Sequence, residues 1–443
     1  MRSAWWVLVA SCGCLGQATR DRYEGVIRAA AARAAVPRAE APRGAVTRDA
    51  LVRAAVSRDP GIAARALRVR ALAESARAEG ALPSPEANAQ VWNVPFARPW
   101  SLGDADMYMV ELRQRLPAWG SLDARARVTL AEAGAGLAEL SARERAVARR
   151  VTDAWADYTA GALHHRVHHE HLGVVEAMHA AARARAVTGG GLEEFARAEL
   201  ERARVLRQIA RFDNDRRRAS RALDALTLRA EATPLEPAVE GRGETVRAPL
   251  TELMGRALAR RAMVAEARSR VEGARAGLDG ARAEATRPEF MVGLSGWFDP
   301  SHHNGYGATV GMTLPWLWGP GGARVAAGEA RLSAEEAGVR EAEVAVRAEV
   351  IDAHARVEGI ERELAVVRAE ALPAADRALD AARAGYVTGA PLLAWLDAAR
   401  MRLDLAMDEA DLVVELARAV AALEEAVGEG LDRVALDDAR SAP

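Results

Sequence analysis

A heptad pattern of apolar residues runs through the second half of the chain. Apolar positions lie alternately four and three residues apart from Val346 to Ala371, and Val325, Leu332 and Val339 extend the series towards the N-terminus. A strict seven-residue repeat predicts a long helix that supercoils in the left-handed sense around a partner helix. The series comprises Val346, Val350, Ala353, Val357, Ile360, Leu364, Val367 and Ala371.

The first half carries a similar helical pattern. An unbroken helix from Trp119 to Val187 would be about 100 Å long at 1.5 Å per residue, which is too long for a compact domain. The glycines of 189–191 and Gly389 are typical helix ends, and Pro391 suits the start of a returning helix. Each half is therefore predicted to contain an antiparallel helical hairpin with its tip near residue 190 or 390. The first-half apolar series is Leu137, Leu140, Val147, Val151, Ala154 and Tyr158.

The chain contains an internal duplication. Val-Thr-Gly at 187–189 recurs at 387–389, and Leu-Pro at 116–117 recurs at 314–315. A repeat of about 200 residues with the same order of elements predicts two equivalent structural units. The predicted boundaries are a first repeat at 47–230, a linker at 231–248, a second repeat at 249–427 and a C-terminal tail at 428–443.

Two blocks break the helical pattern and alternate apolar with small or polar residues. This period of two predicts strands at about 86–93, 106–116, 289–298 and 305–314. Tryptophans flank the strands, as in outer-membrane strands of about ten residues. The residues expected to face lipid are Tyr108, Val110, Leu112, Phe290, Val292, Leu294, Tyr306, Val310 and Met312.

The number of strands limits what they can form. Two isolated hairpins are marginally stable in water. Four strands do not close a barrel, and an open sheet edge is unstable in lipid because its backbone N–H and C=O groups are left without hydrogen-bond partners. If the strands span a membrane, several copies of the chain must share one barrel. The predicted fold class is mainly α with a small β part, built from a duplicated helix, β-hairpin and long helical hairpin.

Composition and charge narrow the function. Half of the residues are hydrophobic but only 5% are aromatic, which is typical of long helices. A formal net charge of −2 excludes a strongly basic nucleic-acid binder, so no nucleic-acid partner is expected. We find no P-loop, Gly-x-Ser-x-Gly or His-Glu-x-x-His motif, which predicts a passive protein with no enzymatic activity and no cofactor.

The N-terminus resembles a bacterial lipoprotein signal. A basic start and a short apolar run precede Val9-Ala10-Ser11-Cys12, which is similar to a lipobox. This resemblance implies a signal peptide at 1–11, lipidation of Cys12 and a lipidated arm at 12–46. The alternative is an unlipidated secretory signal in which both cysteines, Cys12 and Cys14, are incidental.

Several motifs together resemble the TolC family of outer-membrane efflux proteins, over residues 47–427. Ser-Arg-Asp-Pro-Gly-Ile at 57–62 is similar to the family's Asn-Pro-x-Ile segment, with Asp in place of Asn. Gly-Tyr-Val-Thr-Gly at 385–389, followed by Leu-Asp-Ala at 396–398, is similar to its Tyr-x-x-Gly and Leu-Asp-Ala signature. The Leu-Pro motif before a glycine and the duplicated order of elements also match.

The resemblance implies a homotrimer in the outer membrane of a Gram-negative bacterium. Each chain would give four strands to a twelve-stranded barrel, continued by an α-helical barrel in the periplasm. A periplasmic adaptor and an inner-membrane transporter would be its partners, together with outer-membrane lipid. The implied function is export of drugs or metal ions with a resistance–nodulation–division pump. Protein secretion with an ABC transporter is the alternative role, and a periplasmic coiled-coil scaffold without a pore is the alternative from a different class.

The resemblance also implies roles for the tips. The residues expected to contact the adaptor are Thr188, Gly189, Gly190, Gly191, Thr388, Gly389, Ala390 and Pro391. Asp397 matches an acid that constricts the periplasmic entrance in the family. The segment from Gly389 to Asp397 is one residue shorter than usual, and Ala394 stands where a second acid is common.

Six of the nine histidines lie between residues 164 and 179. On a helix, His164, His168 and His171 share a face, and such a face is a candidate Zn²⁺ or Cu²⁺ site. The alternative is that this stretch continues the apolar seam beyond Tyr158, so that its histidines pack instead of binding metal.

Overall fold

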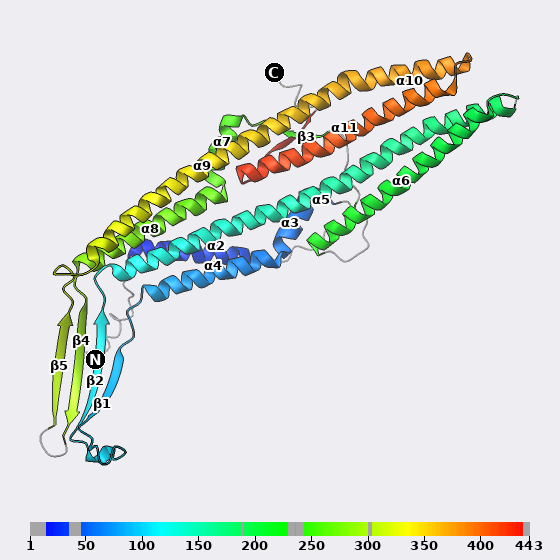
Figure 1. Cartoon of the computed structure of the whole chain (residues 1–443). Coiled ribbons are helices and arrows are strands. Elements are labelled where there is room, and N and C mark those ends of the chain that lie inside the picture. Colours follow the sequence, from blue (N-terminus) through cyan, green and yellow to red (C-terminus); the bar gives the residue numbers. More distant parts are fainter. Residues whose placement is uncertain are drawn as a thin grey trace. The chain divides into compact units, whose positions relative to one another are not determined.

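The computed structural model describes residues 15–34, 46–187, 189–228, 235, 243–299 and 304–436. The predicted signal peptide, Cys12 and Thr188 lie outside the described residues. The described chain is mainly helical with a four-stranded sheet and a short two-stranded sheet (Figure 1). This confirms the predicted fold class.

The described residues divide into two compact units. The first unit combines α2 with residues 63–140 and 263–342, and the second combines residues 46–62, 141–262 and 343–436. The helices are α2 (Gln17–Ala34), α3 (Arg48–Arg58), α4 (Pro60–Glu79), α5 (Ser121–Val187), α6 (Leu192–Thr227), α7 (Leu250–Arg260), α8 (Ala262–Thr286), α9 (Gly321–Val366), α10 (Leu372–Val387) and α11 (Leu392–Val427).

The duplication is visible in the bounds of the helices. Helix α5 has 67 residues and ends at Val187, and the continuous series from α9 to α10 ends 200 residues later at Val387. The returning helices α6 and α11 have 36 residues each and begin at Leu192 and Leu392. The long helical hairpins of the two repeats therefore begin and end at corresponding positions.

The heptad seam of the second repeat is buried as far as one irregular turn. Val346, Val350 and Leu364 are fully buried. Between α9 and α10, Val367–Ala371 (η2) form a π-helix rather than an α-helix. Pro373 explains this turn, because proline has no N–H to donate and its ring crowds the carbonyl four residues earlier. Val367 and Ala371, which the pattern placed in the seam, are only half-buried as a result.

The four-stranded sheet is antiparallel throughout, with the order β1-β2-β4-β5. Its strands are β1 (Glu86–Trp92), β2 (Met107–Leu116), β4 (Phe290–Phe298) and β5 (Gly305–Met312). A short helix, η1 (Leu102–Asp104), precedes β2. The central pair joins β2 of the first repeat to β4 of the second, and β1 and β5 are the edges (Figure 1).

The strand register gathers the apolar side chains on one face. Leu112 pairs with Leu294, and Val292 pairs with Val310. Directly paired residues lie on the same face of a sheet and successive residues on opposite faces. All nine residues predicted to face lipid therefore share one face, where Leu294 is 64% and Val310 75% exposed.

Three segments outside the repeats contain elements that the sequence analysis did not predict. The arm at 12–46 contains helix α2, whose Ala-rich sequence favours a helix. Val26 and Ala30 of α2 pack in a buried cluster with Val69. The linker and the C-terminal tail contribute β3 (Glu244–Val246) and β6 (Arg433–Ala435), which pair with each other. Strands of three residues are too short to show a hydrophobic period.

The contacts of Asp59 explain why this chain has Asp where the Asn-Pro-x-Ile segment has Asn. Its carboxylate accepts the Ile62 N–H at 2.9 Å and the Arg143 guanidinium at 2.8 Å. A carboxylate ahead of Pro60 caps the new helix, and proline suits the first helical position. Burial raises the pKa of Asp59, but the hydrogen bonds from Arg143 and Ile62 outweigh burial and lower it overall.

Among the described residues, no helix combines the length and the apolar character that a membrane-spanning helix requires.

Candidate functional site

The tips of the two helical hairpins form the candidate site, and glycine permits both turns. Gly189 and Gly191 adopt φ values of 96° and 80°, and Gly389 adopts 112°. This left-handed region is costly for residues with a Cβ atom. The sequence prediction placed both turns correctly.

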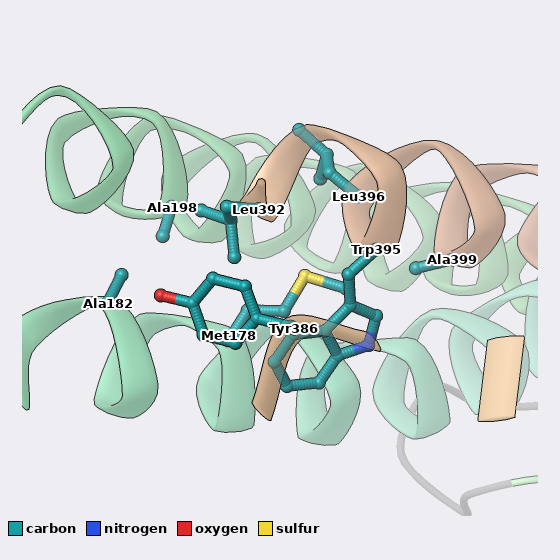
Figure 2. Packing of buried hydrophobic residues seen from close by; sticks show 8 residues of the cluster. All are labelled: Met178, Ala182, Ala198, Tyr386, Leu392, Trp395, Leu396 and Ala399. Atoms are coloured by element: carbon teal, nitrogen blue, oxygen red, sulfur yellow. The ribbon is translucent and has the colours of Figure 1, made fainter. Parts of the chain in front are cut away.

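Behind the tips, one apolar cluster joins the two hairpins (Figure 2). Tyr386 at the end of α10 and Trp395 in α11 have ring centroids 5.5 Å apart. Side chains from α5 and α6 pack against these rings, so residues about 200 positions apart share one core. The cluster comprises Met178, Ala182, Ala198, Tyr386, Leu392, Trp395, Leu396 and Ala399.

Glu194 of the first hairpin caps a helix of the second. Its carboxylate accepts the Leu392 N–H at 3.0 Å, the Arg185 guanidinium at 3.3 Å and the Tyr386 hydroxyl at 3.3 Å. Pro391, the residue before α11, provides no side-chain cap of its own. The backbone hydrogen bond from Leu392, followed by Arg185, holds the pKa of Glu194 below its ordinary value.

The outermost tip residues are exposed and apolar. Val187 is 82%, Leu192 76% and Val387 83% exposed. A Cβ atom added at Gly189 or Gly389 would meet no atom within 4 Å. Of the other predicted tip residues, Gly190 and Pro391 are exposed, and Gly191 and Ala390 are partly exposed. The Thr388 hydroxyl donates a hydrogen bond to the Gly385 carbonyl.

Asp397, the predicted gate residue, is exposed on the first turns of α11. It lies close to Arg400, whose pKa is raised mainly by its hydrogen bond to Glu201 and further by the charge of Asp397. The structure therefore places Asp397 next to an ion pair that the sequence analysis did not anticipate.

That ion pair belongs to a buried polar layer below the apolar cluster. Arg400 of α11 binds Glu201 of α6 at 2.5 Å, and Glu201 is 7% exposed. His171 of α5 is 3% exposed, and its Nε2 has no hydrogen-bond partner. Burial lowers the pKa of His171 to about 4, although the charge of Glu201 acts in the opposite direction.

The histidines of residues 164–179 contact neighbouring helices and do not converge on a common site. His164 lies 2.8 Å from Asp411 of α11, and His168 binds the backbone carbonyl of His164. Phe212 of α6 packs against both rings with centroid distances of 4.9 Å. In the part of the chain that the structure describes, no three acidic, histidine or cysteine side chains are arranged to hold a metal ion. His168 is buried and packs against Phe212, as the seam alternative predicts.

Replacing Glu194 with alanine is expected to loosen the first turn of α11. Loss of a helix cap costs about 1 kcal/mol, so amide hydrogens at Leu392–Trp395 should exchange about five-fold faster in a hydrogen-exchange experiment. The matched control is Glu193→Ala, because the Glu193 side chain is 77% exposed and binds Arg197 on its own helix. Equal exchange in both variants would contradict the capping role.

Acid is expected to weaken this region through His171. A histidine with a pKa of about 4 when folded and about 6.5 when unfolded costs no stability above pH 6.5. Stability then falls as the pH drops from 6.5 towards 4, by up to about 3 kcal/mol. His171→Gln should remove part of this loss in thermal melts at pH 7 and pH 5. His169→Gln, at an exposed position, should behave like the unaltered chain, and a similar loss in all three proteins would refute the assignment.

Comparisons with known proteins agree with this architecture. Residues 253–429 match the model of the outer membrane efflux protein family. No protein with curated annotation matches the sequence. The fold is similar to the outer membrane protein VceC of Vibrio cholerae (20% identity, TM-score 0.70, covering 87% of this chain and 97% of VceC).

Two further channels are similar. The MtrE outer membrane channel of Neisseria gonorrhoeae has 21% identity and a TM-score of 0.69, covering 87% of this chain and 89% of MtrE. The CmeC outer membrane channel of Campylobacter jejuni has 13% identity and a TM-score of 0.67, covering 90% of this chain and 92% of CmeC. At these identities the likeness concerns the fold, whereas the family match concerns the second repeat. Residues 253–429 are thus similar to the outer membrane efflux protein family, and the described chain shares the fold of these outer-membrane channels.

Proposed function

We propose that the chain is the outer-membrane channel of a tripartite efflux system in a Gram-negative bacterium. The observation that carries the proposal is the exposed apolar face of the four-stranded sheet, on which Val310 and Leu294 are mostly exposed. An apolar face of this kind is unfavourable in water and suits contact with lipid. The channel is a passive duct for small molecules, and the pump selects which of them are exported.

The sheet edges support a homotrimer. Strands β1 and β5 each have one side without a strand partner in the sheet. Unpaired backbone groups cost several kcal/mol each in hydrocarbon, so β5 of one copy must pair with β1 of the next. Three copies of four strands give a barrel of twelve strands.

A lipid anchor at Cys12 fits the position of the residues that follow it. The Gly16 N–H and the Thr19 hydroxyl both bind the Asp123 carboxylate, at 2.8 and 2.7 Å. Asp123 lies in the first turn of α5, just after the exposed Trp119 and the end of β2. Four residues of extended chain span at most about 14 Å. An acyl chain on Cys12 would then be within reach of the end of the sheet, where the membrane surface would lie.

The tips provide the surface for a periplasmic adaptor and for the gate. Exposed Val187, Leu192 and Val387 offer apolar contacts, and the glycines allow a partner helix to approach closely. Three copies of Asp397 around a threefold axis would repel one another and attract cations. The adaptor would connect the duct to an inner-membrane transporter.

The lipid face is tested by placing arginine on either side of one strand. Val310→Arg should abolish the membrane-bound trimer, because arginine costs about 2–4 kcal/mol at the bilayer midplane on a lipid-facing position. Thr309→Arg, on the opposite face, should leave the trimer intact. The measurement is membrane fractionation followed by mass determination of the detergent-extracted particle.

Equal effects of the two variants would refute the assignment of the faces. A soluble monomer of the unaltered chain would refute the channel and favour a periplasmic scaffold. Export of a protein substrate by an otherwise intact trimer would favour the secretion alternative.

The tip roles are tested with a photo-crosslinking residue at three positions in intact cells. At Val187 and Val387 we expect crosslinks to a second protein of adaptor size. At Asp397 we expect crosslinks between copies of this chain, because a gate residue lies near the threefold axis. The exposed Arg211 of α6, away from the tips, serves as a control. Crosslinks to the adaptor only from Arg211 would overturn the tip assignment, and an absence of crosslinks between copies at Asp397 would overturn the gate.

A further inference from the structure

Trp297 lies on the face of the sheet opposite to the apolar one. It pairs with Met109 of β2 and with Gly305 of β5. Paired residues share a face, and these three alternate with lipid-facing neighbours. In the proposed barrel this second face lines the lumen, so Trp297 is near the end of the lumen remote from the helices.

Two glycines of β5 create the space that the indole occupies. A Cβ atom at Gly305 would lie 2.5 Å from Cε2 and Cζ2 of Trp297, and one at Gly307 would lie 3.1 Å from Cζ3. Real Cβ atoms essentially never approach as closely as 2.5 Å, so Gly305 is required while the indole remains there, whereas a Cβ atom at Gly307 would be tightly packed against the ring. The ring therefore lies along the strand over both glycines, and the side chain stays partly exposed.

A carboxylate lies next to the indole on the same face. Glu111 pairs with Ser295, two residues before Trp297, which makes Glu111 and Trp297 diagonal neighbours. Glu111 is 4% exposed, and its Oε1 forms an ion pair with Arg113 at 2.6 Å. Its buried Oε2 has no hydrogen-bond partner in the structure. Because Arg113 offsets the charge of this carboxylate, the attraction for cations comes from the indole face itself.

We propose that Trp297, packed over Gly305 and Gly307, is a stacking site for flat aromatic cations inside the duct. The site rests on the proposed function, because the sheet face is luminal only in a closed barrel. Stacking against an aromatic face tolerates many ligand shapes. Three copies would give a transported cation a weak, repeated contact near the exit.

The test measures block of ionic current through the purified trimer in planar lipid bilayers. Ethidium is the flat aromatic cation, and tetraethylammonium is the cation without a ring. Ethidium should block the unaltered channel at a lower concentration than tetraethylammonium. Trp297→Ala should raise the half-blocking concentration of ethidium about ten-fold, which is the order expected for one desolvated cation–π contact. Trp297→Phe should retain most of the block.

Two further variants separate binding from general damage. Gly305→Ala should displace the indole and weaken ethidium block as Trp297→Ala does, while the trimer stays intact. Tyr306→Ala, adjacent on β5 but on the lipid-facing side, should leave the block unchanged. Equal ethidium block in the unaltered, Trp297→Ala and Gly305→Ala channels overturns the site but not the channel. A membrane-inserted trimer that carries no current contradicts the proposed duct, and the site with it.

Discussion

The need to pair every backbone N–H and C=O group in lipid determines how this chain must assemble. Its sheet has two open edges, β1 and β5, and an apolar face that is exposed. In hydrocarbon, each edge needs a further strand to hydrogen-bond its backbone groups. In the proposed channel a single chain is therefore an incomplete structure, and a closed barrel depends on identical copies. Lipid on one face and solvent on the other would then account for the period-two alternation of the strands.

The duplication satisfies a second constraint, because the tips of the two helical hairpins must lie side by side to share one apolar cluster. Helices of 67 and 36 residues recur 200 positions apart, so the tips from both repeats meet in one apolar cluster. The repeats have diverged where they touch. Pro391 begins α11 without a cap, and Glu194 from the other repeat supplies it. Each hairpin is thus stabilised by the other, and the tip behaves as one structural element.

The sequence predicted what depends on local patterns and missed what depends on distant partners. Heptads, glycine turns and alternating strands placed the helices, the tips and the apolar face. Glu194, Glu201 and Arg400 gave no signal, because their partners lie on other helices, and His171 was considered only as a metal ligand. The π-helix was missed because a heptad series does not reveal the irregular turn before Pro373. Helix α2 was missed because proline and arginine around it suggested a linker, although its alanines favour a helix.

The sequence of strand β5 reflects the different surroundings of the two faces of the sheet. Apolar Tyr306, Val310 and Met312 alternate with Gly305, Gly307 and Gly311. Glycine weakens a strand, because it costs conformational entropy and offers no side chain to pack. Its presence is explained where a neighbouring side chain uses the space, as Trp297 does over Gly305 and Gly307. Glu111 and Arg113 of β2 lie over Gly293 of β4 in the same way. The large side chains and the glycines on the face opposite to the apolar one are therefore complementary, and in the proposed barrel the shape of the lumen would be determined by pairs of strands rather than by any single residue.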